Sequence, residues 1–487
     1  MASGHSPHGT RILHVSPEAV PFSKVGGLAD VAGSLPPALR RYGADCRLLL
    51  PAWDGVLDDV HERGLKLTRI SQRVTVAVRW EVQKGALWKC VNGDLPVYFL
   101  ESPLFRGREI YPHHLETDSV LPFVFLSLAA LELPEAAKWT PDIIHCHDWG
   151  TAPLITALRW HHHYRSMQPR FKTVFTIHNL AHQGLLPLSS LREWGIADDA
   201  LTLNGVEFYG GANLMKGAIE GASAITTVSP SYAREIQTEM GGVGLGGLLR
   251  GHRDKLTGIL NGLDSYYWNP ETDALLPANY SSDDLSGKIE CRNALFREIG
   301  WEQDNRPLFT SVGRMVDQKG FDILLPSIAE MVERGCRLFL LGSGQPEYEA
   351  AVHKATSAWP DAVSSFIGFN EPLAHLAYAG GDFFMMPSKF EPCGLSQLIA
   401  LRYGTVPVAR AVGGLADTVF ENDSPDSNGF LFSGYSPEAL LSAVERALTI
   451  FRDREKYLRL VKTGMNSDYS WERSAPLYLD LYRSLLP

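Results

Sequence analysis

The most constraining feature of this chain is the alternation, from end to end, of short apolar runs with stretches whose apolar residues recur at helical spacing. This alternation is typical of βαβ units, in which parallel strands are joined by helices that cover the sheet. One series of apolar runs begins with RILHVS, and a second begins with LFTSVGR after the segment LTGILNGLD. We therefore predict an α/β fold made of two Rossmann-like, doubly wound domains.

The length of 487 residues supports two domains, because a single hydrophobic core stops growing well below that size. We predict an N-terminal domain over residues 1–255, a second domain over residues 256–470, and a final helix within residues 471–487.

Charge and composition exclude several classes of partner. The net charge of −10 provides no general attraction for nucleic acid or anionic lipid. The longest apolar run, residues 120–131, is too short to span a bilayer, and the N-terminus lacks the apolar stretch of a signal peptide. The six cysteines are thinly spread, as is usual in a reducing compartment. We expect a cytoplasmic protein that binds neither nucleic acid nor membrane.

The segment SKVGGL follows the first predicted strand and opens a helix. The paired glycines Gly26 and Gly27 let the backbone approach a ligand, and the helix start and Lys24 favour an anion. A solvated lysine beside an ordinary glycine turn is the alternative. Part of this motif, VGGLAD, recurs at residues 412–417.

A second cationic segment, GRMVDQKG, directly follows the predicted strand LFTSV. From this strand end, the guanidinium of Arg314 and the ammonium of Lys319 can share a diphosphate, which would then need no metal ion. The alternative is a pair of charges on an exposed loop.

A third segment, PSKFEPCGLSQ, lies between an apolar strand and a helix. Gly394 and Leu395 offer helix amides to a phosphate, Ser396 can cap the helix, and Glu391 can bind sugar hydroxyls. Cys393 is as suited to packing as to contact with a ligand.

Two strand ends in the first domain, HCHDWG and TIHNLAHQG, are unusually polar, which suits contact with substrate hydroxyls. A metal site is the rival interpretation of these histidines, but their spacing does not match zinc patterns. The chain has no Asp-x-Asp pair, which disfavours the sugar-nucleotide transferases that hold Mn²⁺ or Mg²⁺ with such a pair. Residues 242–247 satisfy GxGxxG but follow a helix-like segment, so a dinucleotide site is not indicated.

Taken together, KVGGLADV, HCHDWG, TIHNLAHQG, LNGLD, GRMVDQKG, KFEPCGLSQL and VGGLADTV resemble the motif series of bacterial glycogen synthases and plant starch synthases. These are retaining glucosyltransferases of the GT-B fold, with two Rossmann-like domains that face each other across a cleft. The resemblance implies ADP-glucose as donor, an α-1,4-glucan such as glycogen as acceptor, no metal or other cofactor, and a C-terminal helix that crosses back onto the first domain.

The same resemblance implies roles for individual residues. It implies that the donor is bound by Lys24, Gly26, Gly27, Asp30, Asn261, Arg314, Lys319, Phe369, Glu391, Cys393, Gly394, Leu395 and Ser396, with Phe369 near the adenine. It implies catalytic roles for His178, Asp148, Glu391, Arg314 and Lys319, and an acceptor platform at Trp149. No oligomeric state is predicted.

The chain departs from many retaining GT-B enzymes at Ile399, where those enzymes have a second glutamate eight positions after the first. Three alternatives stay open: a related enzyme that uses UDP-glucose or a small acceptor, a nicotinamide-dependent oxidoreductase, and a non-catalytic glucan-binding protein. Retention is compatible with front-face substitution or with double displacement, for which Asp148 is the candidate nucleophile.

Overall fold

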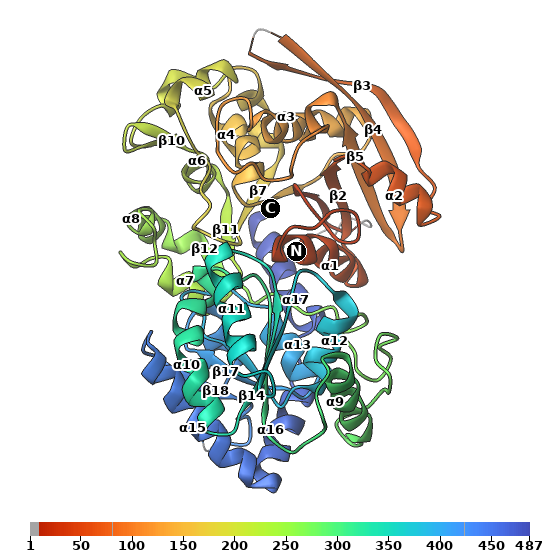
Figure 1. Ribbon diagram of the computed structural model, residues 1–487. Helices are drawn as coiled ribbons and strands as arrows, with labels where there is room; N and C mark the ends of the chain where they lie inside the picture. Colours follow the sequence, from red (N-terminus) through yellow and green to blue (C-terminus); the bar gives the residue numbers. More distant parts are fainter. Residues whose placement is uncertain (1–8, 80, 423) are drawn as a thin grey trace, which may run out of the picture. The chain divides into compact units, whose positions relative to one another are not determined.

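The computed structural model describes residues 9–79, 81–422 and 424–487, and it divides into two compact units (Figure 1). Unit 1 comprises Met1–Val228, Ala233–Gly262 and Trp471–Pro487, and unit 2 comprises Ser229–Tyr232 and Leu263–Ser470. Most of the N-terminal segment used above to argue against a signal peptide, residues 1–8, lies outside the described ranges.

Unit 1 is built on a nine-stranded sheet in the order β12-β11-β7-β6-β1-β2-β5-β4-β3. The strands are β1 (Arg11–Val15), β2 (Asp45–Pro51), β3 (Thr68–Val78), β4 (Glu81–Asn92), β5 (Leu95–Glu101), β6 (Ile143–His147), β7 (Lys172–Ile177), β11 (Ala224–Thr227) and β12 (Leu256–Gly258). All pairs are parallel except β3–β4 and β4–β5. The central strands are buried on both faces, which is why their sequences are continuous apolar runs.

Helices cover the sheet of unit 1. They are α1 (Gly27–Arg41), α2 (Val56–Glu62), α3 (Leu121–Ala136), α4 (Ala152–Trp160), α5 (Leu188–Glu193), α6 (Leu214–Gly221), α8 (Gly246–Gly251) and α17 (Trp471–Leu485). A further helix, α7 (Pro230–Glu235), begins in the segment Ser229–Tyr232 of unit 2 and ends in unit 1. A small sheet contains β8 (Leu185–Leu186), β9 (Glu207–Phe208) and β10 (Gly211–Asn213). The longest apolar run of the sequence forms most of α3, which is buried along nearly its whole length.

The C-terminal helix α17 belongs to unit 1 and packs beside α1 (Figure 1). Arg41 forms an ion pair with Glu472 at 2.6 Å, and the Tyr42 hydroxyl donates to the carbonyl of the same glutamate at 3.0 Å. Tyr482 of α17 is fully buried. The last residues of the chain therefore complete the core of the first unit.

The boundary between the units lies after Gly262, several residues beyond the predicted boundary at 255/256. The cause is β12, which pairs in parallel with β11 through Ile225 and Leu256 and so extends the first sheet. A three-residue edge strand has too little sequence of its own to reveal which sheet it joins.

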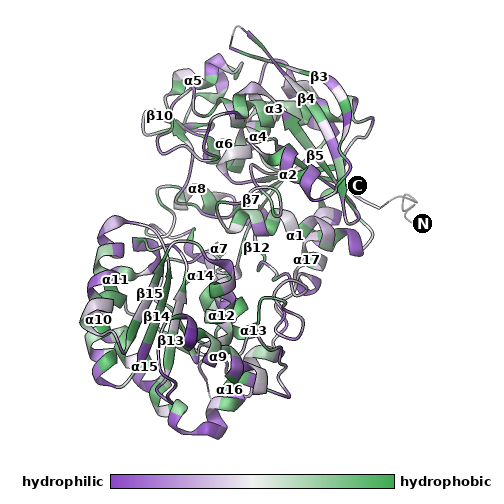
Figure 2. Ribbon diagram, turned by 45° about the vertical axis from the view of Figure 1, so that its right-hand side comes forward, coloured by the Kyte–Doolittle hydropathy of each residue, from purple (hydrophilic) through white to green (hydrophobic). Residues whose placement is uncertain are grey.

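Unit 2 contains a six-stranded parallel sheet in the order β15-β14-β13-β16-β17-β18. The strands are β13 (Leu308–Val312), β14 (Arg337–Gly342), β15 (Val363–Ile367), β16 (Phe383–Met386), β17 (Val406–Arg410) and β18 (Phe430–Phe432). The helices are α9 (Ser286–Glu298), α10 (Phe321–Glu333), α11 (Pro346–Ala358), α12 (Glu371–Gly380), α13 (Ser396–Arg402), α14 (Gly413–Thr418), α15 (Pro437–Arg452) and α16 (Arg454–Asn466). Figure 2 shows the hydrophobic colour along its central strands.

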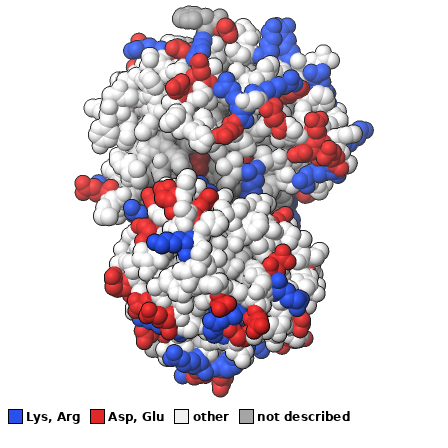
Figure 3. Space-filling model, viewed as in Figure 1, with Lys and Arg blue, Asp and Glu red and all other residues white. Residues whose placement is uncertain are grey.

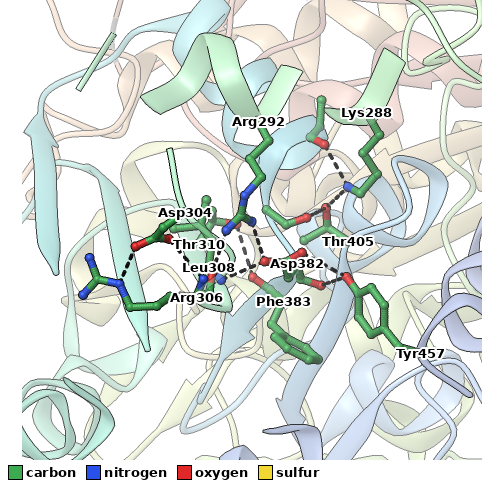
Figure 4. Close-up of polar contacts among 12 residues, drawn as sticks. Lys288, Arg292, Asp304, Arg306, Leu308, Thr310, Asp382, Phe383, Thr405 and Tyr457 are labelled. Carbon is green, nitrogen blue, oxygen red and sulfur yellow. Dashed lines mark hydrogen bonds and ion pairs between the residues drawn. The ribbon is translucent and has the colours of Figure 1, made fainter. Parts of the chain in front are cut away.

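A partly buried polar cluster links helices and strands of unit 2 (Figure 4). The ammonium of Lys288 donates to the carbonyls of Ala379 and Tyr403, at the ends of α12 and α13, at 2.8 and 3.0 Å. The Asp382 carboxylate accepts from Arg292 and from the Leu308 amide, the latter at 2.8 Å. This cluster fixes the starts of β13 and β16, the two strands that lead into the site loops.

Charged side chains of both signs are interspersed on the face of the molecule shown in Figure 3. Within the described part of the chain, none of the helices combines the length and the apolar character needed to cross a bilayer.

Candidate functional site

In unit 1, the carboxyl ends of the neighbouring strands β6 and β7 bring Asp148 and His178 together. The Asp148 carboxylate accepts a hydrogen bond from the His178 backbone N–H at 2.7 Å, and the Asp148 N–H donates to the Thr176 carbonyl at 3.0 Å. Asp148 has a positive φ of 57°, which non-glycine residues adopt rarely and often at functional sites. The structure therefore places these two predicted residues in direct contact.

Burial shifts the pKa of both side chains away from their usual values. It raises the pKa of Asp148 to about 7, although backbone N–H groups of His178 and Asn179 oppose the shift. Burial, with a smaller contribution from His147, lowers the pKa of His178 well below its usual value. At neutral pH the imidazole is uncharged and can form hydrogen bonds to sugar hydroxyls, whereas Asp148 is close to its point of half-protonation.

Three further histidines lie behind His178, and the sequence did not single out His14 among them. Nδ1 of His147 lies 3.0 Å from Nε2 of His178, and Nδ1 of His14 lies 3.2 Å from Nε2 of His147. The ring of His145 stacks on that of His147 at 4.3 Å between centroids. All three of these side chains are fully buried.

One ring nitrogen from each of His14, His145 and His147 lies within 4.8 Å of the others, which is the geometry of the rival metal interpretation. Hydrogen bonds already engage both nitrogens of His145, through Tyr482 and Thr176. Both nitrogens of His147 are engaged as well. A metal ion would have to break these contacts, so hydrogen bonding accounts for this cluster better.

The SKVGGL loop places Lys24 at the surface and a carboxylate behind it. Glu18, which the sequence analysis did not predict, is buried and accepts hydrogen bonds from the amides of Val25 and Gly26, the latter at 3.3 Å. Lys24 forms an ion pair with Asp30 at 2.7 Å and keeps half of its side chain exposed. The Gly26 amide therefore already has an internal acceptor, and Lys24 is the cation that this loop offers to a ligand.

Trp149 is placed differently from its predicted role as an acceptor platform. Its side chain is only 6% exposed, and its ring lies 4.7 Å from that of Phe123 between centroids. The reason is α3, which covers this turn with an apolar face that local sequence around the tryptophan does not reveal. An exposed platform for a sugar ring is therefore not available from Trp149 in unit 1.

In unit 2, the neighbouring strands β13 and β16 lead to Lys319 and Glu391. The Lys319 ammonium lies 2.6 Å from a carboxylate oxygen of Glu391, and the Ser388 hydroxyl donates to the same oxygen at 3.0 Å. The side chain of Glu391 is 7% exposed and that of Lys319 is 25% exposed. The two predicted catalytic residues thus form a largely buried ion pair.

Arg314, just after β13, is exposed, and its guanidinium has no ion-pair or hydrogen-bond partner among the described residues. Its guanidinium lies in the same loop as Lys319 and is suited to bind an oxyanion, because it can donate two parallel hydrogen bonds.

The Gly394 turn precedes α13, and its φ of 73° favours glycine. The buried side-chain amide of Gln397 donates to the carbonyls of Cys393 and Gly394, both at 3.0 Å, and so holds the turn. Cys393 is 4% exposed, which favours its packing interpretation. Ser396 is the first residue of α13 and not its cap, since Leu395 occupies the cap position and makes no side-chain capping bond.

The second VGGLAD segment supports the same turn. The amide of Gly414 donates to the carbonyl of Glu391 at 3.1 Å, and a Cβ added to Gly413 would lie 2.0 Å from that carbonyl oxygen. Close approach of two backbones therefore requires glycine here. The repeated motif serves as a packing element in unit 2.

Two predicted donor contacts remain. Asn261 of unit 1 is 5% exposed, and its buried Oδ1 has no hydrogen-bond partner among the described residues. Phe369 of unit 2 lies between β15 and α12 and is 87% exposed, which leaves its ring available for stacking on a base.

Comparisons with known proteins cover most of the chain. Residues 11–251 match the family model described as starch synthase catalytic domain, and residues 306–449 match the one described as glycosyl transferases group 1. A glycogen synthase of an Anaeromyxobacter species is 45% identical over 480 residues, which is 97% of this chain and 99% of that protein. The glycogen synthase of Marinobacter nauticus is 42% identical over 495 residues, with 98% of each chain covered.

A solved structure is similar over nearly the whole chain. It is the catalytic domain of starch synthase IV from Arabidopsis thaliana bound to ADP and acarbose, which is 35% identical. The TM-score is 0.91, and the match covers 98% of this chain and 99% of that one.

Proposed function

Since the chain belongs to the bacterial glycogen synthase and starch synthase family of GT-B glycosyltransferases, we propose that it transfers glucose from ADP-glucose to the non-reducing end of an α-1,4-glucan, with retention of configuration. The main support is the end-to-end similarity to glycogen synthases, joined to the Lys319–Glu391 pair and the free Arg314 guanidinium in unit 2. The choice of ADP-glucose over UDP-glucose is supported by the Arabidopsis domain, whose structure contains ADP.

We assign binding of the diphosphate of ADP-glucose to cationic side chains. Cleavage of the bond between glucose and phosphate leaves negative charge on the departing ADP, and preorganised donors stabilise such charge most strongly. In unit 2, Arg314 and Lys319 supply positive charge for the diphosphate, and the amides of the Gly394 turn add partial positive charge. Lys24, with Gly26 and Gly27, is the corresponding element of unit 1, and Phe369 is assigned to the adenine.

We assign the reacting glucose to Asp148 and His178 in unit 1 and to Glu391 in unit 2. Positive charge develops at the anomeric carbon in the transition state, so electron-rich groups beside the sugar stabilise it. The backbone carbonyl of His178 is such a group, and the neutral imidazole of the same residue adds no positive charge beside the sugar. Asp148 is less suited to be a covalent nucleophile, because one of its oxygens already accepts the His178 N–H and its pKa is raised to about 7.

We therefore favour front-face substitution. The acceptor hydroxyl oxygen forms the new glycosidic bond as the bond between the anomeric carbon and the phosphate oxygen breaks. The hydroxyl proton passes to the departing phosphate, so that the products are the extended glucan and ADP. No divalent ion is needed in this scheme, because protein cations neutralise the diphosphate.

The proposal is tested by ADP release from ADP-glucose with and without glycogen, in EDTA, alongside UDP-glucose. We expect glycogen-dependent release from ADP-glucose, a much lower rate with UDP-glucose, and elongation of the glucan through α linkages. Faster turnover of UDP-glucose would favour a related enzyme with another donor. Binding of glycogen without any nucleotide release would instead support a non-catalytic glucan-binding protein.

We also expect the protein to act in the cytoplasm. All six cysteines are buried, and none of them forms a disulfide, which fits a reducing compartment.

A further inference from the structure

A row of three imidazoles extends from His178 into the core of unit 1. His14 contacts His147 at 3.2 Å, and His147 contacts His178 at 3.0 Å. His14 and His147 are 0% exposed and His178 is 9% exposed. We call His14, His147 and His178 the histidine row.

All members of the histidine row are neutral at neutral pH. Burial lowers the pKa of His147 to about 3 and the pKa values of His14 and His178 well below the usual range. A neutral imidazole has one N–H and one bare nitrogen, so it donates through one and accepts through the other. The two contacts of the row therefore have a common direction.

Only two directions are possible. In the first, every ring is protonated at Nδ1, so that His14 donates to His147 and His147 donates to His178. In the second, every ring is protonated at Nε2, and the donation runs from His178 through His147 to His14. The first direction leaves the Nδ1–H of His178 for a ligand, and the second leaves the Nε2–H of His14 at the inner end.

The inner end of the row distinguishes the two directions. Nε2 of His14 is buried and has no hydrogen-bond partner among the described residues. The second direction would place an N–H there without any acceptor, and orphaned buried N–H groups are rarer in native proteins than under-satisfied acceptors. The first direction leaves only a bare nitrogen at that position and is therefore favoured.

We propose that the histidine row holds His178 in its Nδ1–H tautomer, so that His178 faces the substrate as a hydrogen-bond donor and His147 acts as its positioning residue. The identity of the substrate atom rests on the proposed function, in which it is an oxygen of the sugar or the phosphate. A donor at this position does not accept the proton of the attacking hydroxyl. That proton therefore goes to the departing phosphate oxygen, as the front-face scheme requires.

A neighbouring histidine provides a matched control. His145 packs on His147, and its two nitrogens contact the hydroxyls of Tyr482 and Thr176 at 2.7 and 2.6 Å. A hydroxyl can donate or accept, so these contacts support the row without setting its direction. Tyr482→Phe removes one buried hydrogen bond of the cluster and leaves the contact between His147 and His178 in place.

The tautomer is measured directly by nitrogen NMR of the full chain labelled with ¹⁵N-histidine, with the signals of His178 assigned by their loss in His178→Asn. We expect a protonated Nδ1 and a bare Nε2 for His178, in the wild type and in Tyr482→Phe. A protonated Nε2, or an even mixture of tautomers, would overturn the proposal. This measurement needs no turnover, so it is independent of the proposed function. If the protein transfers glucose and His178 is protonated at Nε2, the tautomer proposal alone is refuted. If the protein shows no transfer and His178 is protonated at Nδ1, the transfer function alone is refuted.

Variants test the consequence for the reaction. In His147→Phe we expect the His178 signals to lose their single tautomer and kcat to fall about 10- to 100-fold, as when an orienting partner is removed, with KM for ADP-glucose changed by less than about threefold. Tyr482→Phe should change neither the tautomer of His178 nor kcat. The side-chain amide of asparagine overlaps Nδ1 of histidine and that of glutamine overlaps Nε2, so His178→Asn should retain more activity than His178→Gln, and the reverse order would contradict the proposal.

Discussion

Lys319→Ala separates the structural and the catalytic roles of the ion pair in unit 2. Lys319 and Glu391 are in contact at 2.6 Å, and the glutamate side chain is 7% exposed. After removal of the ammonium, the buried carboxylate still accepts a hydrogen bond from the Ser388 hydroxyl but has lost its cationic partner. The variant therefore loses stability as well as a cation for the diphosphate.

The size of each effect follows from burial. Removal of one partner of a buried ion pair costs about 3–5 kcal/mol, and removal of both partners is often nearly neutral. Since the Lys319 side chain is 25% exposed, we expect the free energy of unfolding to fall by about 2–3 kcal/mol in Lys319→Ala. In the double variant Lys319→Met/Glu391→Gln the loss should be below about 1 kcal/mol. In both, kcat should fall about 10²- to 10³-fold, because a preorganised charge is missing in the transition state.

Urea denaturation gives the free energy of unfolding, and ADP release with glycogen gives kcat. Lys354→Ala, which removes an exposed lysine of α11 in the same unit, serves as the matched control and should change neither quantity. The catalytic reasoning is refuted if Lys319→Ala folds and keeps kcat within about threefold of the wild type. The reasoning from burial is refuted if the single variant is as stable as the double variant.

Three further results are expected. Arg314→Ala should lower kcat about 100-fold and leave the free energy of unfolding within about 0.5 kcal/mol, because the guanidinium is exposed; parallel kinetics and denaturation check both. Asp148 has a pKa of about 7 in the folded chain against 3.8 for an unperturbed carboxyl, so the folded state holds a proton that the unfolded state releases between these values. Its contribution therefore makes the free energy of unfolding fall as pH rises from about 4 to 7, by about 2–4 kcal/mol, and denaturation of Asp148→Asn across this range should show a flatter dependence. Finally, EDTA should change the rate of ADP release by less than about twofold, and a larger loss that Mg²⁺ or Mn²⁺ restores would contradict a metal-independent mechanism.

Local sequence patterns predicted the elements that carry the site. The strands RILHVS, DIIHCHD and LFTSVGR correspond to β1, β6 and β13, because a buried parallel strand needs a continuous apolar run whatever surrounds it. The positions of Lys319, Glu391 and Gly394 just after strands followed from the same pattern, since loops at carboxyl strand ends are short and polar.

Other features depended on contacts that local sequence does not encode. Trp149 follows a strand, and the family resemblance implied an acceptor platform there, but α3 buries this side chain through Phe123. The boundary after Gly262 depends on the pairing of β12 with β11. Glu18 and Gln397 were missed because nothing in their flanking residues signals that they hold the amides and carbonyls of the site loops.

The sequence by itself determined the two α/β units, the order of their strands along the chain and the loops that bear the cations and polar groups, because these depend on spacing within short segments. Only the tertiary structure decided which side chains meet. Lys319 and Glu391 are in contact because β13 and β16 are neighbours in the sheet, and the histidine row forms because β1, β6 and β7 lie side by side. The order of strands in a parallel sheet is set by the packing of the whole unit, so contacts between distant segments become visible only once the chain is folded.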